Sequence, residues 1–321
     1  MANEEVGRRL FCAAQVGSTV LERRSAPRHL AIKALYVAIW NDHGPTVAAL
    51  LTGARGRALR RVIQRPQASS TPMPLPFAVA HGSTAAAAVL LQAKADVDMC
   101  GVSRTPLWLA AQQGDVPTVH LLVQAKADVD LCAAGYETPI GVAAIAGHEP
   151  VVALLVAAKA DVHKTSFIRR TAVCHAARHG HARIVALLAE ARADVDRADC
   201  DDSTPLWLAS RAGHVPAVQT LVDSRADVNK TSFMGATSLS KAATLGHACV
   251  VSALLDAKAD VDLADDWGRT PLLQSALAEH AQVASLLLHA KADAAIADIG
   301  GNVPLYYIDK VGNARVDTVV L

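Results

Sequence analysis

Three short motifs recur in phase along most of this chain, and they constrain its fold more than any other feature. The first motif is a Lys or Arg followed by Ala-Asp, and its copies are spaced first by 32 and then by 33 residues. Its Asp stands at Asp96, Asp128, Asp161, Asp194, Asp227, Asp260 and Asp293. Segments such as TPLWLAA, from Thr105, keep the same step. A Gly follows nine residues after the Thr position throughout, except in the copy that has Glu279 there. Such a period is typical of an array of stacked structural units.

Each unit carries the signals of two short antiparallel helices. Thr105 can cap the first helix with its hydroxyl, and Pro106 suits the first helical position, where an N–H is not needed. Leu107, Ala110 and Ala111 then form a narrow apolar stripe. The Gly ends that helix because it adopts a left-handed conformation without steric cost. A second stripe, such as residues 151 to 155, marks the second helix, and we expect a turn from the Asp to the next Thr.

The composition fits a stack of units better than one large core. The chain has 321 residues, of which 52% are apolar, yet 64 are Ala and 12 are Phe, Trp or Tyr. A single core seldom grows beyond about 250–300 residues, whereas stacked units can bury small faces at close helix spacing. The net charge of +1 argues against disorder, and the longest apolar run, residues 151 to 158, is shorter than the ~20 residues that cross a bilayer. We expect a soluble array without a transmembrane segment.

The repeated unit resembles the ankyrin repeat. The resemblance rests on the T-P-L-x-x-A-A and D-V-[DN] elements, and it covers residues 71 to 321 as about eight units, the last of them a short C-terminal cap or a truncated unit. It implies an all-α solenoid of L-shaped units, in which helix pairs form one arm and hairpin-like loops the other. It also implies a non-catalytic scaffold or adaptor that binds a protein ligand, whose identity the sequence does not give.

Two positions depart from the pattern of this family. The His usual after T-P-L is replaced, for example by Trp108, Cys174 and Trp207, so the loop contact of that His is not expected. The Gly usual before Ala-Asp is a cation in seven copies: Lys94, Lys126, Lys159, Arg192, Arg225, Lys258 and Lys291. We predict either a positive φ at these residues, at a cost of about 1–2 kcal/mol each, or a different helix end. A cation at a helix C-terminus recovers about 0.3–1 kcal/mol.

Residues 1 to 70 are less regular and carry an excess of positive charge. They hold 11 Lys and Arg against 4 Asp and Glu, whereas the rest of the chain holds 20 against 26. Fragments at residues 10 to 17 and 34 to 38 are interpreted as two degenerate units that cap the array. Residues 53 to 71 are interpreted as an inserted loop or a break in the stack.

The Arg-rich segment, residues 53 to 65, offers an alternative function. It could bind nucleic acid or an anionic membrane surface. We favour a solvated linker or a contact with the acidic array, because no aromatic residues lie among the arginines as single-strand binders require. Nucleic acid is therefore not the expected partner.

No sequence signature of catalysis is found. The common phosphate-binding, zinc-protease, nucleophile and dinucleotide motifs are missing. The richest titratable cluster is Cys174, His175, His179 and His181, in which two histidines four residues apart could hold a metal ion, but surface and interface roles are favoured. We expect no enzyme activity, no metal and no cofactor. The alternative is an ankyrin fragment of a larger enzyme, such as a ubiquitin ligase or a kinase.

The candidate binding surface comes from two positions of the repeat. Loop tips, three and four residues before the Thr, hold large apolar side chains for which the pattern offers no core; packing of hairpin on hairpin is the alternative of equal weight. Positions seven and eight after the Thr, and the position just before it, add Arg and His. The protein-binding surface is predicted to be Phe167, Ile168, Arg170, Arg178, His179, Arg211, Phe233, Met234, Trp267 and Arg269.

Smaller features complete the expectations. Trp108, Trp207 and Tyr306 are interpreted mostly as packing between repeats. Asn229, in Asp-Val-Asn, resembles the asparagine that hydroxylases modify in ankyrin repeats and is a candidate hydroxylation target. Six scattered cysteines and a start without a secretory or transit pattern favour the cytoplasm, with the nucleus as alternative. We expect a monomer.

Overall fold

The computed structural model describes residues 28–52, 56–64, 73–100, 104–132 and 137–310. The chain divides into two compact units, Met1–Ala160 and Asp161–Leu321, which are described separately. In the described residues of both units, the regular elements are α-helices, with one short 3-10 helix. The predicted all-helical repeat fold is confirmed.

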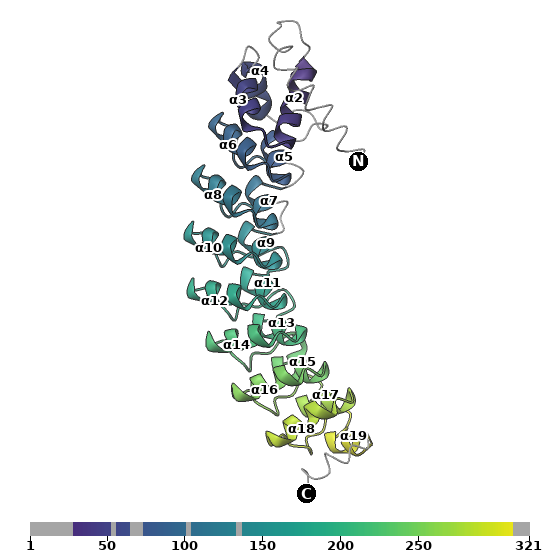
Figure 1. The fold of residues 1–321 in the computed structure, drawn as a ribbon. Helices are drawn as coiled ribbons and strands as arrows, with labels where there is room; N and C mark the ends of the chain where they lie inside the picture. The colour runs from purple at the N-terminus through teal and green to yellow at the C-terminus, as the bar shows by residue number, and fades with distance from the viewer. Residues whose placement is uncertain (1–27, 53–55, 65–72, 101–103, 133–136, 311–321) are drawn as a thin grey trace. The chain divides into compact units, whose positions relative to one another are not determined.

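The first unit is built of helix pairs with one additional helix (Figure 1). The first helices of successive pairs pack on one another, and the second helices do the same in a parallel row. The helices are α2 (Arg28–Trp40), α3 (Gly44–Thr52), α4 (Gly56–Gln64), α5 (Pro74–Ala80), α6 (Thr84–Gln92), α7 (Pro106–Gln113), α8 (Val116–Gln124), α9 (Pro139–Ala146) and α10 (Glu149–Ala157).

The second unit repeats the same two rows. Its first helices, α11, α13, α15, α17 and α19, lie on one side and its second helices on the other (Figure 1). The elements are α11 (Ala172–Arg178), α12 (Ala182–Glu190), α13 (Pro205–Ala212), α14 (Val215–Asp223), η1 (Phe233–Gly235), α15 (Ser238–Thr244), α16 (Ala248–Asp256), α17 (Pro271–Leu277), α18 (Ala281–His289) and α19 (Pro304–Lys310).

The predicted helix caps are present. Thr105 and Thr138 each accept a hydrogen bond from the backbone N–H three residues later, at 3.1 Å. The corresponding Thr residues of the second unit accept the same bond. The predicted stripe is also buried, since Leu107, Ala110 and Ala111 have no exposed surface. The caps satisfy backbone donors that a helix start leaves free, while the alanines let neighbouring helices approach.

The glycines that end the first helices have the predicted positive φ, for example +73° at Gly114. Glu279, which replaces this Gly in one copy, has φ of +60°. A histidine of the following repeat covers the glycine: a Cβ built on Gly114 would lie 2.6 Å from Nδ1 of His148. His148 Nε2 also donates to the Gln112 carbonyl at 3.1 Å. The histidines at the starts of the second helices therefore join successive repeats.

All seven cations that replace the family's Gly have a positive φ, between 62° and 68°. The first of the two outcomes predicted for these positions is therefore confirmed. Each of the seven side chains is exposed. Because the side chain lies in solvent, it needs no space in the core. Backbone strain is therefore the main free-energy cost of having Lys or Arg at this position.

The Asp-Val-Asp segments link successive loops. In the first unit, Asp128 donates its backbone N–H to Asp98 at 2.9 Å. In the second unit, Asn229 accepts the same bond from the Asp260 backbone at 2.8 Å, and the amide of Asn229 is exposed. The candidate hydroxylation target thus already holds the next repeat through its Oδ1 atom.

The N-terminal region contains a helix pair where a degenerate unit was expected at residues 34 to 38, and one helix that the sequence did not predict. Helices α2 and α3 form a pair that packs on α5 and α6, while the fragment at residues 10 to 17 lies outside the described residues. Residues 56 to 64, expected in an inserted loop, form α4. Its Leu59, Val62 and Ile63 are buried, while Arg57, Arg60 and Arg61 are exposed. A domain boundary at residue 70 stays a prediction.

Candidate functional site

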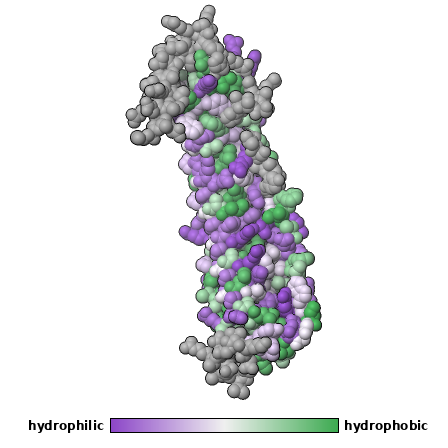
Figure 2. All heavy atoms as spheres, turned by 90° about the vertical axis from the view of Figure 1, so that its right-hand side faces the viewer, coloured by the Kyte–Doolittle hydropathy of each residue, from purple (hydrophilic) through white to green (hydrophobic). Residues whose placement is uncertain are grey.

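A hollow of about 410 Å³ opens in the second unit between the loops and the first helices. Its walls come from α13, the η1 loop, α15, the loop before α17 and α17 itself. This side of the chain, on the right in Figure 1, shows hydrophobic side chains among hydrophilic ones (Figure 2). The residues around the hollow are Trp207, Ser232, Phe233, Met234, Ala236, Ser240, Lys241, Thr244, Asp265, Trp267, Arg269, Gln274, Leu277 and Ala278.

Large apolar side chains of the hollow are exposed to solvent. Phe233 is 62% exposed, Met234 43%, Leu277 43% and Trp267 38%. Three of these four were predicted from the loop-tip phase. Exposed apolar surface that is concentrated in one place is typical of an interaction site, whereas single exposed apolar residues are ordinary.

Backbone pairing between neighbouring loop tips holds these side chains outward. The Phe233 N–H donates to the Asp201 carbonyl at 3.2 Å, and the Asp266 N–H donates to the Met234 carbonyl at 3.1 Å. Met234 has φ of +68°, a strained value for a residue with a side chain. Hairpins therefore do join hairpins, but through their backbones, which leaves Phe233 and Met234 exposed.

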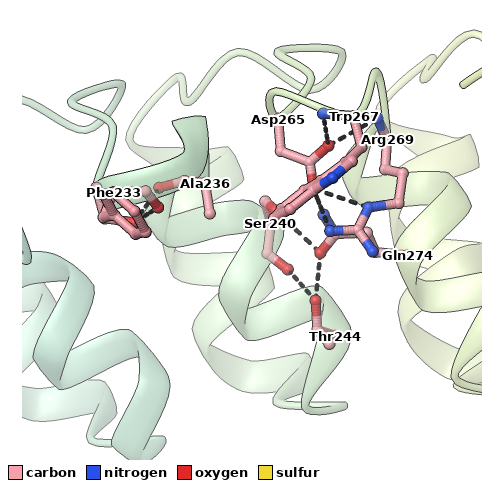
Figure 3. Close-up of polar contacts among 9 residues, drawn as sticks. Phe233, Ala236, Ser240, Thr244, Asp265, Trp267, Arg269 and Gln274 are labelled. Atoms are coloured by element: carbon pink, nitrogen blue, oxygen red, sulfur yellow. Dashed lines mark hydrogen bonds and ion pairs between the residues drawn. The ribbon is translucent and has the colours of Figure 1, made fainter. Parts of the chain in front are cut away.

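The buried carboxylate of Asp265 organises the loop before α17 (Figure 3). Its Oδ1 accepts from the backbone N–H groups of Trp267 and Arg269, at 3.0 and 2.9 Å. Its Oδ2 accepts from Arg269 Nε at 2.9 Å and from Gln274 Nε2 at 2.9 Å. The guanidinium of Arg269 also stacks on Trp267, with Cζ 4.4 Å from the ring centroid. Trp267 is thus fixed by the network below it.

Gln274 extends this network to the neighbouring repeat. Its Oε1 accepts from Ser240 Oγ at 3.0 Å and also from the Thr244 hydroxyl (Figure 3). One amide therefore binds both Asp265 and α15, and it satisfies the polar groups of these residues within the protein.

Two cations lie beside the indole of Trp207 at the edge of the hollow. Arg211 Cζ and Lys241 Nζ are each 5.6 Å from the ring centroid. Partial burial and the nearby charge of Arg211 lower the pKa of Lys241 below its ordinary value. The region therefore combines aromatic surface with positive charge.

The predicted surface separates into two groups. Phe233, Met234, Trp267 and Arg269 line the hollow, and Arg211 lies at its edge. The remaining predicted residues, Phe167, Ile168, Arg170, Arg178 and His179, are not among its walls.

The second group lies on the repeat that begins at Thr171. Phe167 is 80% exposed, and Arg178 and His179 are exposed at the end of α11. Arg170 instead binds the fully buried Asp199 of the next loop, with Nε and Nη2 each 2.9 Å from Oδ2. Arg170 thus joins two loops, and its side chain is 12% exposed.

Several residues of the hollow escaped the sequence analysis. Trp207 was interpreted mostly as packing between repeats, and Lys241, Gln274 and Leu277 were not singled out. All four lie on first helices: Trp207 three residues after its Thr, Lys241 and Gln274 four residues after theirs, and Leu277 seven. The repeat phase could have identified Leu277, because it stands seven residues after its Thr, as does Arg211, which the sequence analysis assigned to the binding surface.

The His cluster has an ordinary structural setting. His175 is buried, His179 and His181 have ring centroids 6.2 Å apart, and burial together with Arg178 and nearby histidines lowers the pKa of His179. Burial raises the pKa of the Cys174 thiol, whose Sγ donates to the Arg197 carbonyl at 3.4 Å. Among the described residues, no group of three or more His, Cys, Asp and Glu is arranged to hold a metal ion.

In the described part of the chain, no helix has the length and apolar character needed to span a membrane.

A family model described as ankyrin repeats (3 copies) matches residues 75–166, 140–232 and 229–299. The chain is also similar to the crystal structure of the ankyrin repeat domain of Bcl-3, described as a unique member of the IkappaB protein family. The identity is 25% and the TM-score 0.60, over 65% of this chain and 99% of that one. A search of curated protein sequences gave no match.

Proposed function

Because this chain belongs to the ankyrin repeat family, we propose that it is a non-catalytic scaffold or adaptor whose second unit holds a protein partner in the hollow. The observation that carries this proposal is the concentration of Phe233, Met234, Trp267 and Leu277 around one 410 Å³ space. Aromatic side chains and Arg at the centre of a contact supply much of the binding energy in protein complexes.

The polar groups of the hollow support binding rather than catalysis. Asp265 is its buried carboxylate, and that group is already paired with Arg269 and Gln274. A carboxylate held in this way orients a loop and is not free to take a proton from a substrate. The volume suits one or two large side chains of a partner.

We propose that Phe167, Ile168, Arg178 and His179 extend the contact to a second region of the same partner. Phe167 and Arg178 are exposed on the repeat that precedes the hollow by one copy. Arg170 belongs to the proposed surface through the loop that it holds against Asp199. The cytoplasmic location, the monomeric state and hydroxylation of Asn229 stay predictions.

The proposal is tested by affinity capture with quantitative mass spectrometry. The full chain is compared with the Phe233→Ala/Trp267→Ala variant, the Phe167→Ala/Arg178→Ala variant and Ile299→Ala, in which a tip residue that is 77% exposed outside the hollow is truncated. We expect the first variant to lose partners at least tenfold, the second to lose fewer and Ile299→Ala to lose none. Circular dichroism confirms folding. Equal recovery by folded wild type and the Phe233→Ala/Trp267→Ala variant would contradict the proposal.

A further inference from the structure

Arg211 and Lys241 form a pair of cations without a carboxylate partner. In the described part of the chain, neither side chain has an ion pair, and each lies beside the Trp207 ring, with its charged group 5.6 Å from the ring centroid. Two other arginines of the second unit do have carboxylate partners: Arg170 binds Asp199, and Arg269 binds Asp265. The fold therefore neutralises two of its arginines and leaves two neighbouring cations uncompensated.

The exposed Arg211 repels the half-buried Lys241. Partial burial and, to a smaller extent, the charge of Arg211 lower the pKa of Lys241. A carboxylate placed near both groups would relieve this repulsion, and a charge-assisted bond is stronger there than in open solvent. This part of the hollow is therefore prepared for an anionic group.

The apolar walls indicate what accompanies that anion. Phe233, Trp267 and Leu277 line the same hollow as Lys241 and are exposed. A ligand that fills the space must offer a large apolar group beside its negative charge. A basic ligand is disfavoured because the hollow's own cations already occupy the Trp207 face, and Asp265 is neutralised from within.

A nucleic acid strand also combines anions with flat apolar groups, but the surroundings disfavour it. Asp201 and Asp266 are exposed on the loop tips next to the hollow. Several phosphates in a row would meet these carboxylates, whereas one peptide carboxylate need only reach Lys241 and Arg211.

We propose that the hollow receives a peptide segment of the partner in which an Asp, a Glu or a terminal carboxylate lies next to a large apolar side chain. The apolar side chain lies against Phe233, Trp267 and Leu277, and the carboxylate pairs with Lys241 and Arg211. This inference rests on the proposed function, because it specifies the chemistry of the segment that the hollow holds.

The test is selection from a displayed library of random dodecapeptides on the immobilised full chain. The arms are wild type, Lys241→Glu, and Lys258→Glu as a matched charge reversal of an exposed lysine outside the hollow in the same unit. We expect wild type and Lys258→Glu to enrich Asp or Glu beside Trp, Phe, Leu or Met several-fold over the starting library. Lys241→Glu should lose this enrichment and shift toward Lys and Arg.

A second measurement separates the carboxylate contact from general weakening. The selected peptide is compared with its Glu→Gln or Asp→Asn form by fluorescence anisotropy, on wild type and on Lys241→Met. Each single change should weaken binding by about tenfold, which corresponds to about 1.4 kcal/mol. The two changes together should cost little more than one, because both remove the same contact.

The outcomes distinguish this inference from the proposed function. Binding peptides without acidic enrichment, or the same enrichment for Lys241→Glu, would overturn the acidic-segment inference and leave the hollow as a binding site. Failure of every folded arm to select any peptide would overturn the proposed function and this inference together. A third outcome is that a 12-nucleotide single strand binds tightly, that Lys241→Glu abolishes this binding and that no peptide competes with it. This outcome would assign the hollow to nucleic acid and overturn both the proposed function and the acidic-segment inference.

Discussion

At the scale of single residues, the chain has backbone strain at exposed cations in both of its units. Seven Lys and Arg residues have φ values of 62° to 68°, where Gly is favoured. The alanine that follows the cation is buried in most copies, for example Ala127 and Ala160. The sequence predicted either this outcome or a different helix end, because the repeat phase places a cation where the family has Gly, and the structure shows the positive φ.

Replacing one of these cations by Gly should stabilise the protein. For Lys126→Gly, relief of about 1–2 kcal/mol of strain, less the favourable effect of a cation at the helix end, predicts a gain of about 0.5–1 kcal/mol in the free energy of unfolding. Urea denaturation followed by circular dichroism measures the change. Lys126→Ala is the matched control, since it removes the charge but keeps the strain. Equal stability of the Gly and Ala variants would contradict this explanation.

His179 should make stability depend on pH. Burial, Arg178 and the neighbouring histidines lower its pKa in the folded state below the ordinary value of about 6.5. Between the two pKa values the unfolded chain binds more protons, so stability is complete above about pH 6.5 and falls as the pH decreases through this range. His179→Gln should flatten the dependence of unfolding free energy on pH between 7 and 5. An unchanged slope in His179→Gln would show that other groups cause the dependence.

At the scale of elements, the helices follow from local signals and the loops do not. The Thr caps, the ending glycines and the apolar stripes predict the helix pairs at residues 105 to 125 closely. The hydrogen bonds and ion pairs between loops were not predicted, because they depend on which side chains of successive repeats come into contact. Arg170 was predicted to belong to the binding surface, which stays a prediction, whereas its ion pair with Asp199, 29 residues away, was not predicted. Helix α4 was missed because its Arg-rich sequence conceals a buried face of Leu59, Val62 and Ile63.

The tie between Arg170 and Asp199 should be important for the stability of the second unit. Asp199 is fully buried, so Arg170→Ala leaves an uncompensated charge and should lower the free energy of unfolding by about 3 kcal/mol. Arg211→Ala, which removes an exposed arginine without an ion pair, should change it by less than about 0.5 kcal/mol. Thermal and urea unfolding of both variants provide the comparison. Similar losses in the two variants would show that the ion pair contributes little.

At the scale of the whole molecule, the abundance of alanine and the scarcity of aromatic residues have one structural origin. Alanines such as Ala110 and Ala143 fill the faces between first helices, so a large aromatic core is not needed. Phe233 and Trp267 are then left for the surface, and the repeat phase predicted this correctly. The hollow itself was not predictable, because its walls combine residues of three repeats, such as Trp207, Lys241 and Leu277.

The central claim, that the hollow in the second unit holds the partner, is tested most directly by photo-crosslinking in cells. The photoreactive residue p-benzoylphenylalanine replaces Phe233 in the full chain and, as a control, replaces Ile299, an exposed tip residue outside the hollow. We predict one discrete protein adduct from position 233, lost when Trp267→Ala is added to the folded chain, and none of that mass from position 299. The same adducts from both positions, or an adduct from 233 that is insensitive to Trp267→Ala, would contradict the account.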